Sequence, residues 1–129
     1  MSLYNYDRWD NFTKEELICS HTGLENPNVG IFVSLMDDVQ EIRSYVGVPF
    51  EVTSAYRHPT HPEEASRGKQ GQHTKAAIDI RVPIEYCHIV LEKAFELGFT
   101  GIGVNLTGDL NQRFIHLDKR SSKPRVWSY

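Results

Sequence analysis

The 129-residue sequence contains no apolar run long enough to cross a membrane, and no charged segment followed by an apolar stretch opens it. A transmembrane helix needs about 20 apolar residues, so we expect neither a membrane span nor a signal peptide. The expected place of accumulation is the cytoplasm of the producing cell. Internal repeats and low-complexity tracts are also missing, and the length suits one domain over residues 1–129, expected to be a monomer.

Cysteine is scarce as well, and the sequence has no excess of positive charge. The two cysteines, Cys19 and Cys87, can build neither a disulfide framework nor a CxxC metal site. We expect Cys19 to be a free thiol, because a structural metal beside it and His21 would need two further ligands. The net charge of -3 provides no basic surface for nucleic acid, so we expect no nucleic-acid partner.

Residues that bind metals are what the sequence does contain. His73 and Asp79 occur in GQHTKAAIDI, and His116 and Asp118 occur in RFIHLD. A catalytic zinc takes three such protein ligands and keeps a fourth position for a water, whose pKa it lowers to about 7. We therefore expect a hydrolase that uses zinc.

Alternation along two segments predicts where these side chains point. In AAIDIR, Ile78 and Ile80 have the period of a strand with one buried face, which places Asp79 on the other face. The same alternation in RFIHLD places His116 and Asp118 away from the core. Because residues i and i+2 of a strand share a face, Asp118 should lie beside His116, and it is the predicted general base. Arg120, two residues later, could orient that carboxylate and would then lower its basicity.

The order of elements predicts an α+β fold, with a small antiparallel sheet, helices packed on one face and the zinc site on the other. Thr13 and Glu16 form a capping box that begins a short helix, and a longer amphipathic helix is expected over about residues 31–45. FEVTS and AAIDIR are predicted strands on either side of a polar loop over about residues 57–72. A helix is expected after Pro83, and GIGVN and RFIHLD should form a hairpin.

Five sequence runs, SAYRHPTH, QHTKAAIDI, GFTGIGVN, FIHLDKR and a C-terminal RVW, resemble in this order the LAS-type zinc peptidases. These are D-alanyl-D-alanine carboxypeptidases and peptidoglycan endopeptidases, many of them encoded by phages. FTKEELICSHTG extends the resemblance over nearly the whole chain. It implies that His73, Asp79 and His116 bind zinc, through an SxHxxGxAxD segment and a later His. It also implies that Arg57, in SAYR, contacts the substrate or transition state.

The sequence departs from the family pattern in three places. Asp79 follows His73 by six positions where the family has seven, Gly71 replaces the leading Ser, and Arg113 stands where some relatives carry a Glu. A slip of one residue along a strand turns every side chain to the opposite face. We therefore predict that the segment 74–76 absorbs the deletion and that Asp79 still faces the metal.

Several functions remain open. The resemblance implies zinc-dependent hydrolysis of peptidoglycan stem peptides, by a carboxypeptidase or an endopeptidase. This fits a phage endolysin that reaches the wall after release, a virion-associated lysin, or a cytoplasmic bacterial dipeptidase. The alternative is a noncatalytic zinc-binding module of a phage particle, because a fold alone does not determine a function. Arg57 directly follows a predicted strand, which favours a functional role, whereas Trp127 and Tyr129 are expected to cover the core.

Overall fold

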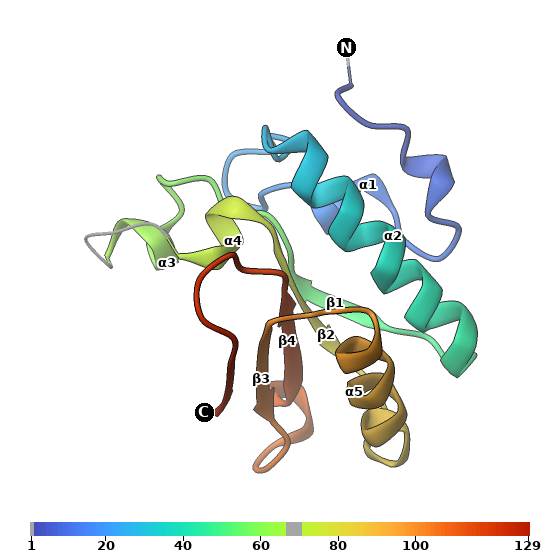
Figure 1. Cartoon of the computed structure of the whole chain (residues 1–129). Coiled ribbons are helices and arrows are strands. Elements are labelled where there is room, and N and C mark those ends of the chain that lie inside the picture. Colours follow the sequence, from blue (N-terminus) through green and yellow to red (C-terminus); the bar gives the residue numbers. More distant parts are fainter. Residues whose placement is uncertain (1, 67–70) are drawn as a thin grey trace.

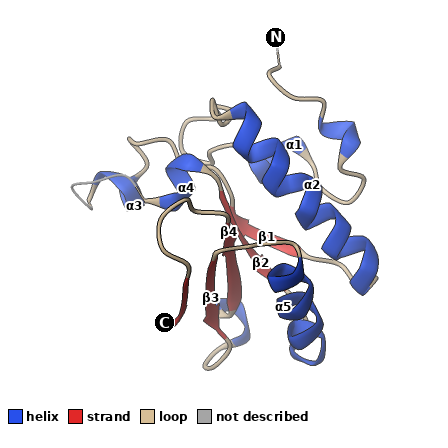
Figure 2. Cartoon of the chain, viewed as in Figure 1, coloured by secondary structure: helices blue, strands red, loops and turns tan. Residues whose placement is uncertain are grey.

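The computed structural model describes residues 2–66 and 71–129, and their architecture is α+β (Figure 1). Within these ranges five strands form one sheet in the order β1-β2-β4-β3-β5 (Figure 2). The strands are β1 (Glu51–Ser54), β2 (Ala77–Arg81), β3 (Gly101–Asn105), β4 (Phe114–Asp118) and β5 (Arg125–Ser128). The helices are α1 (Lys14–Leu17), α2 (Val29–Val46), α3 (Pro62–Ala65), α4 (Gln72–Lys75) and α5 (Cys87–Glu96). Short 3-10 turns cover Tyr6–Arg8, Ile84–Tyr86 and Leu110–Gln112.

Local sequence determines where the helices begin and end. The predicted capping box at the start of α1 is confirmed, because the Thr13 hydroxyl accepts from the Glu16 amide and the Glu16 carboxylate accepts from the Thr13 amide. Helix α2 ends where Gly47 takes a left-handed φ of 77°, a conformation that glycine adopts without steric cost. The helix expected after Pro83 is present as a 3-10 turn followed by α5. The expected polar loop over residues 57–72 contains α3, and its residues 67–70 lie outside the described part of the chain.

The sheet is mixed, which corrects the predicted antiparallel sheet. The pairs β1–β2, β2–β4 and β4–β3 are antiparallel, including the predicted hairpin, but β5 runs parallel to β3. Strand β4 ends beside the start of β3, where Asp118 pairs with Gly101, and Arg125 pairs with Gly101 from the other side. The chain thus returns to the beginning of β3 before β5 starts, so β5 runs in the same direction as β3. The predicted α+β class is confirmed.

The hydrophobic core lies between the sheet and the two longest helices, which contact each other. Its members on these elements are Ile78, Ile80, Ile115 and Leu117 from the strands, and Phe32, Leu35, Met36, Val39, Ile42, Val90 and Ala94 from α2 and α5. Burial of one aliphatic side chain stabilises the fold by about 1.5–3 kcal/mol. A register slip of one residue in β2 or β4 would bury Asp79 or His116 in place of the apolar side chains. The apolar positions of these strands therefore fix which residues lie on the polar face.

Cys19 and Cys87 are buried free thiols. Among the described residues, no helix combines the length and the hydropathy that a bilayer crossing requires.

Candidate metal site

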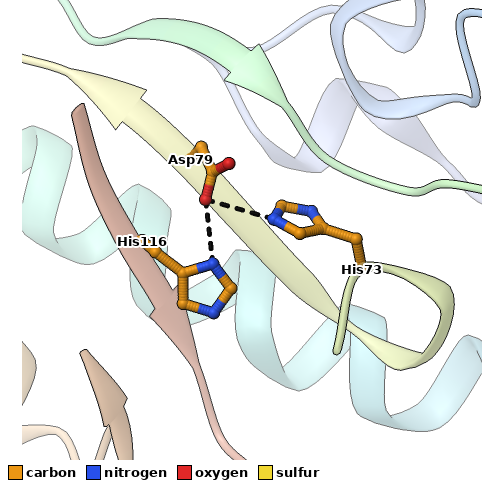
Figure 3. A group of neighbouring side chains, drawn as sticks. All are labelled: His73, Asp79 and His116. Atoms are coloured by element: carbon orange, nitrogen blue, oxygen red, sulfur yellow. Dashed lines mark hydrogen bonds and ion pairs between the residues drawn. The ribbon is translucent and has the colours of Figure 1, made fainter. Parts of the chain in front are cut away.

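Three side chains from separate elements meet on the polar face of the sheet (Figure 3). His73 comes from α4, and Asp79 and His116 sit opposite each other on β2 and β4. Asp79 Oδ1 lies 3.1 Å from His73 Nε2 and 2.9 Å from His116 Nδ1. All three residues are buried, and one ligand atom from each lies within 4.8 Å of the others. Within residues 2–66 and 71–129 this is the one such group that could hold a metal, and neither Cys19 nor His21 belongs to another.

When the two imidazoles are neutral, their outer partners place the single ring proton of each on its outward nitrogen and leave the inward nitrogen free to bind a metal. His73 Nδ1 lies 2.7 Å from the Ala55 carbonyl oxygen, which can only accept, so Nδ1 carries the proton. His116 Nε2 donates in the same way to Asp118 Oδ2, at 2.6 Å. The lone pairs of His73 Nε2 and His116 Nδ1 then both face the Asp79 carboxylate. Only a proton or a cation between these atoms removes their electrostatic repulsion. Two imidazole nitrogens and one carboxylate oxygen are therefore a donor set that fits a divalent metal such as zinc.

Asp118 lies behind His116 and is fully buried. Arg120 Nε and Nη2 donate to its two oxygens at 2.9 and 2.7 Å, and the Arg120 backbone amide donates at 3.0 Å. Burial would raise the pKa of Asp118, but hydrogen bonds from His116 and Arg120 hold that pKa well below its usual range. The predicted general base is thus enclosed and weakly basic. Its geometry favours a different role, in which it orients the His116 imidazole.

The pKa values of the site predict how stability depends on pH. Without a metal, protons on the inward nitrogens take its place. Burial would raise the pKa of Asp79, but hydrogen bonds from His116 and His73 then hold this pKa well below its usual range. Burial would lower the pKa of His116, yet its bonds with Asp118 and Asp79 raise it. In the metal-free protein the carboxylates therefore stabilise the fold above about pH 4 and lose this effect as the pH falls. His116 contributes fully below about pH 6.5, and its contribution is lost as the pH rises through its folded pKa.

Metal binding should reverse the way in which the contribution of His116 to stability depends on pH, because a histidine that binds a metal must be neutral. We expect the difference in melting temperature between metal-loaded and chelator-treated protein to widen as the pH rises from about 6 to 8. Thermal unfolding followed by circular dichroism over this range measures the difference. A constant gap would contradict the proposed protonation of the site.

Arg57 reaches the metal-binding group from the end of β1, where the sequence places it. Its Nη2 lies 4.0 Å from Asp79 Oδ2, and its Nε donates to Ser54 Oγ at 3.0 Å. Its backbone amide also donates to the His73 carbonyl at 3.0 Å, which ties the two segments together. Arg57 lines a cleft of about 650 Å³, here called the metal cleft. Other residues of this cleft are His73, Asp79, His116, Trp127 and Tyr129.

The segment that carries His73 is a single helical turn. Helix α4 ends at Lys75, and Ala76 returns to an extended conformation with φ −162° before β2 begins. Asn28 donates to the Thr74 carbonyl at 3.2 Å and Asn26 donates to the Lys75 carbonyl at 2.8 Å, so the start of α2 holds this turn in place. Asp79 consequently faces His73 and not the core, as predicted from the alternation of β2.

Glu64 belongs to the surroundings of the site, and sequence reasoning missed it. Its side chain is 1% exposed. Glu64 Oε1 accepts from Thr74 Oγ1 at 2.7 Å and from the Gly71 amide at 2.9 Å, while Oε2 lies 3.6 Å from Arg57 Nη1. It thereby joins Arg57 to the turn that carries His73. In the sequence it is one of two adjacent glutamates in a polar loop, and no local pattern distinguishes it from a solvated charge.

Strand β3 makes room for the site with two glycines. A Cβ atom on Gly101 would overlap the Asp118 carboxylate, and one on Gly103 would lie 2.5 Å from the Trp127 ring. The Trp127 ring centroid lies 5.2 Å from that of His116. Trp127, expected to cover the core, is half-buried and forms a wall of the metal cleft.

Gly101→Ala should destabilise the protein by about 1–3 kcal/mol, because the added methyl group must displace a buried carboxylate that Arg120 holds in place. Gly30→Ala is the matched control, since nothing lies within 4 Å of its Cβ position in α2. The control should be neutral or stabilising by up to about 1 kcal/mol. Denaturant unfolding of both variants measures the difference, and equal free energies of unfolding would refute the crowding argument.

A family model described as Peptidase M15 matches residues 10–118. This range contains His73, Asp79 and His116 as well as Arg57 and Asp118. No curated protein matches the chain. No solved structure matches it.

Proposed function

The chain belongs to the peptidase M15 family of LAS-type zinc peptidases, and on this premise we propose that it hydrolyses peptide bonds in the stem peptides of peptidoglycan. The observation that carries the proposal is the convergence of two imidazole nitrogens and a carboxylate oxygen in a cleft beside Arg57. Amide hydrolysis needs a polarised carbonyl group and an activated water, and a metal site with an open position supplies both.

We propose zinc as the metal, held by His73 Nε2, Asp79 Oδ1 and His116 Nδ1. Zinc, when bound, supplies Lewis acidity and lowers the pKa of a bound water to about 7. Structural zinc sites are closed by four protein ligands, whereas the described residues offer three that converge. This count supports catalysis over the noncatalytic module of a phage particle.

Two further residues have distinct proposed roles. Arg57 stabilises the negative charge that develops on the scissile carbonyl oxygen, since its guanidinium group lies in the metal cleft within 4.0 Å of Asp79. Asp118 accepts the Nε2 proton of His116 and so keeps Nδ1 directed toward Asp79. Arg120 holds the Asp118 carboxylate through both of its oxygens.

The proposed setting is the one expected from the sequence. We propose a monomer that accumulates in the cytoplasm of the producing cell and acts on the wall after release, as an endolysin or a virion-associated lysin. A net charge of -3 supports the absence of a nucleic-acid partner. A cytoplasmic dipeptidase would use the same site on short peptides, so the size of the best substrate separates the two settings.

The experiment that tests the proposal treats purified cell walls with zinc-loaded protein and follows turbidity and newly released amino groups. Asp79→Asn is the matched control, because it keeps the side chain's shape and removes the anionic ligand. The parent protein should release peptides that mass spectrometry assigns to one bond, and the control should not. A zinc-loaded parent that cleaves unrelated peptides but no wall peptide would refute the substrate. A loaded protein that cleaves neither would favour the noncatalytic module.

A further inference from the structure

The Arg57 guanidinium group lies between two carboxylates. Its Nη2 is 4.0 Å from Oδ2 of Asp79, which belongs to the metal-binding group, and its Nη1 is 3.6 Å from Oε2 of Glu64. Both separations exceed the length of a charged hydrogen bond, which is about 2.7–2.9 Å. A small movement of the Arg57 side chain toward Asp79 would therefore form a direct ion pair.

A direct pair between Arg57 and Asp79 would impair the site in two ways. The positive charge of the guanidinium group would repel a divalent metal from the carboxylate that is to bind it. The same movement would also take the guanidinium group away from the position in which we propose that it meets the scissile carbonyl. An anion on the other side of Arg57 counteracts both effects.

Glu64 supplies this anion, because its carboxylate is fixed and shielded from water. Its side chain is 1% exposed, and Oε1 accepts from Thr74 Oγ1 at 2.7 Å and from the Gly71 amide at 2.9 Å. With Oε1 engaged in this way, Oε2 is the oxygen nearer to Arg57. Removal of one partner from a buried ion pair leaves the other charge uncompensated, so Arg57 would then turn to Asp79.

Helix α3 directs Glu64 inward through a locally determined turn. His61 Nδ1 accepts from the Glu63 amide at 3.1 Å, and Pro62 occupies the start of the helix, where a missing amide hydrogen costs nothing. The Glu64 amide donates to the His61 carbonyl at 2.9 Å. The turn exposes Glu63 and buries Glu64, so the two adjacent glutamates differ in environment.

We propose that Glu64 is a positioning residue, which holds the Arg57 guanidinium group in the metal cleft and keeps it from pairing with Asp79. The part of this inference that concerns hydrolysis rests on the proposed peptidase function, whereas the part that concerns metal binding does not. Glu64 acts through Arg57, so its effect on the site disappears when Arg57 is absent.

A double-mutant cycle in zinc affinity tests the inference. Glu64→Gln keeps the shape of the side chain and an oxygen that accepts from Thr74 and Gly71. It turns an amide donor toward the Arg57 guanidinium group, which is itself a donor. Glu64→Gln should weaken zinc binding roughly tenfold, as measured against a competing chelator. Arg57→Ala alone should not weaken zinc binding, and adding Glu64→Gln to it should cost less than about twofold.

Two controls separate this effect from general ones. Thr74→Val removes one hydrogen bond to Glu64 and leaves the carboxylate beside Arg57, so it should retain most of the zinc affinity. Glu85→Gln removes an exposed charge that does not line the metal cleft and should have no effect. Equal losses from Glu64→Gln with and without Arg57 would overturn the inference. A loss in Thr74→Val as large as that in Glu64→Gln would also overturn it, because the turn that carries His73 would then be the cause.

Hydrolysis of wall peptides at saturating zinc gives a second readout. Glu64→Gln should lower kcat about tenfold with little change in KM, and it should cause no further loss in Arg57→Ala. The expected zinc cycle in a protein that hydrolyses no peptide would support the role of Glu64 and refute the peptidase function. Unchanged zinc affinity in Glu64→Gln would overturn the inference at any rate of hydrolysis.

Discussion

His73→Ala and His116→Ala should each abolish stoichiometric zinc binding and lower peptide hydrolysis by roughly 1,000-fold or more, because a metal contributes several kcal/mol to the transition state. Each variant leaves one imidazole and one carboxylate, which are too few to hold the metal against dissociation. Elemental analysis after dialysis measures zinc, and the release of amino groups from wall peptides measures hydrolysis.

His88→Ala is the control for these variants. His88 is exposed on α5 and does not belong to the metal-binding group, so its removal should change neither zinc content nor rate. Full zinc occupancy in both His73→Ala and His116→Ala would refute the ligand assignment. Loss of hydrolysis with zinc retained in one of them would reassign that histidine to a catalytic step.

Asp118→Asn should weaken zinc binding by roughly 10–100-fold, the usual cost of losing a carboxylate that orients a ligand histidine. The amide keeps the shape of the side chain but removes the charge that the Arg120 guanidinium balances. Zinc titration with a competing chelator gives the affinity. Hydrolysis is then measured at saturating zinc, where we expect most of the parent rate to return.

The same variant decides between this role and the predicted general base. A base contributes to the reaction itself, so its loss would leave zinc affinity unchanged and lower hydrolysis by roughly 100-fold at every zinc concentration. That result would restore Asp118 as the base. Asp109→Asn serves as the control, because Asp109 is exposed and does not line the metal cleft.

Alternating strands made the central part of the site predictable. Two isoleucines fix the face of Asp79, and Ile115 with Leu117 fixes that of His116, because burial of apolar side chains outweighs any local alternative. The pairing of Asp79 opposite His116 also needs the observed register of β2 and β4, since a shift by two residues would keep both faces and separate this pair. Signals that end a helix, such as Gly47, were equally predictable, because they act through local backbone conformation.

Other features depend on contacts between distant segments and could not be predicted. The parallel strand β5 forms because the chain returns to the start of β3, and RVWS alone does not specify a partner or a direction. Glu64 acquires its role only when α3 folds against Arg57 and Thr74. The sequence suggested that Arg120 orients Asp118, but the two-point contact that weakens the basicity of this carboxylate, and its full burial, appear only in the structure.

The position of Tyr129 bears on how the protein can be handled. Tyr129 lines the metal cleft together with Trp127 at the end of β5. The N-terminal end lies across the molecule from the C-terminus, on the side of α1 and α2 (Figure 1). Any chain that extends past Tyr129 therefore leaves from the rim of the cleft in which we propose that substrate binds. An affinity tag or fused partner placed there would compete with a large substrate for space, whereas the same addition before residue 2 would leave this side of the cleft open.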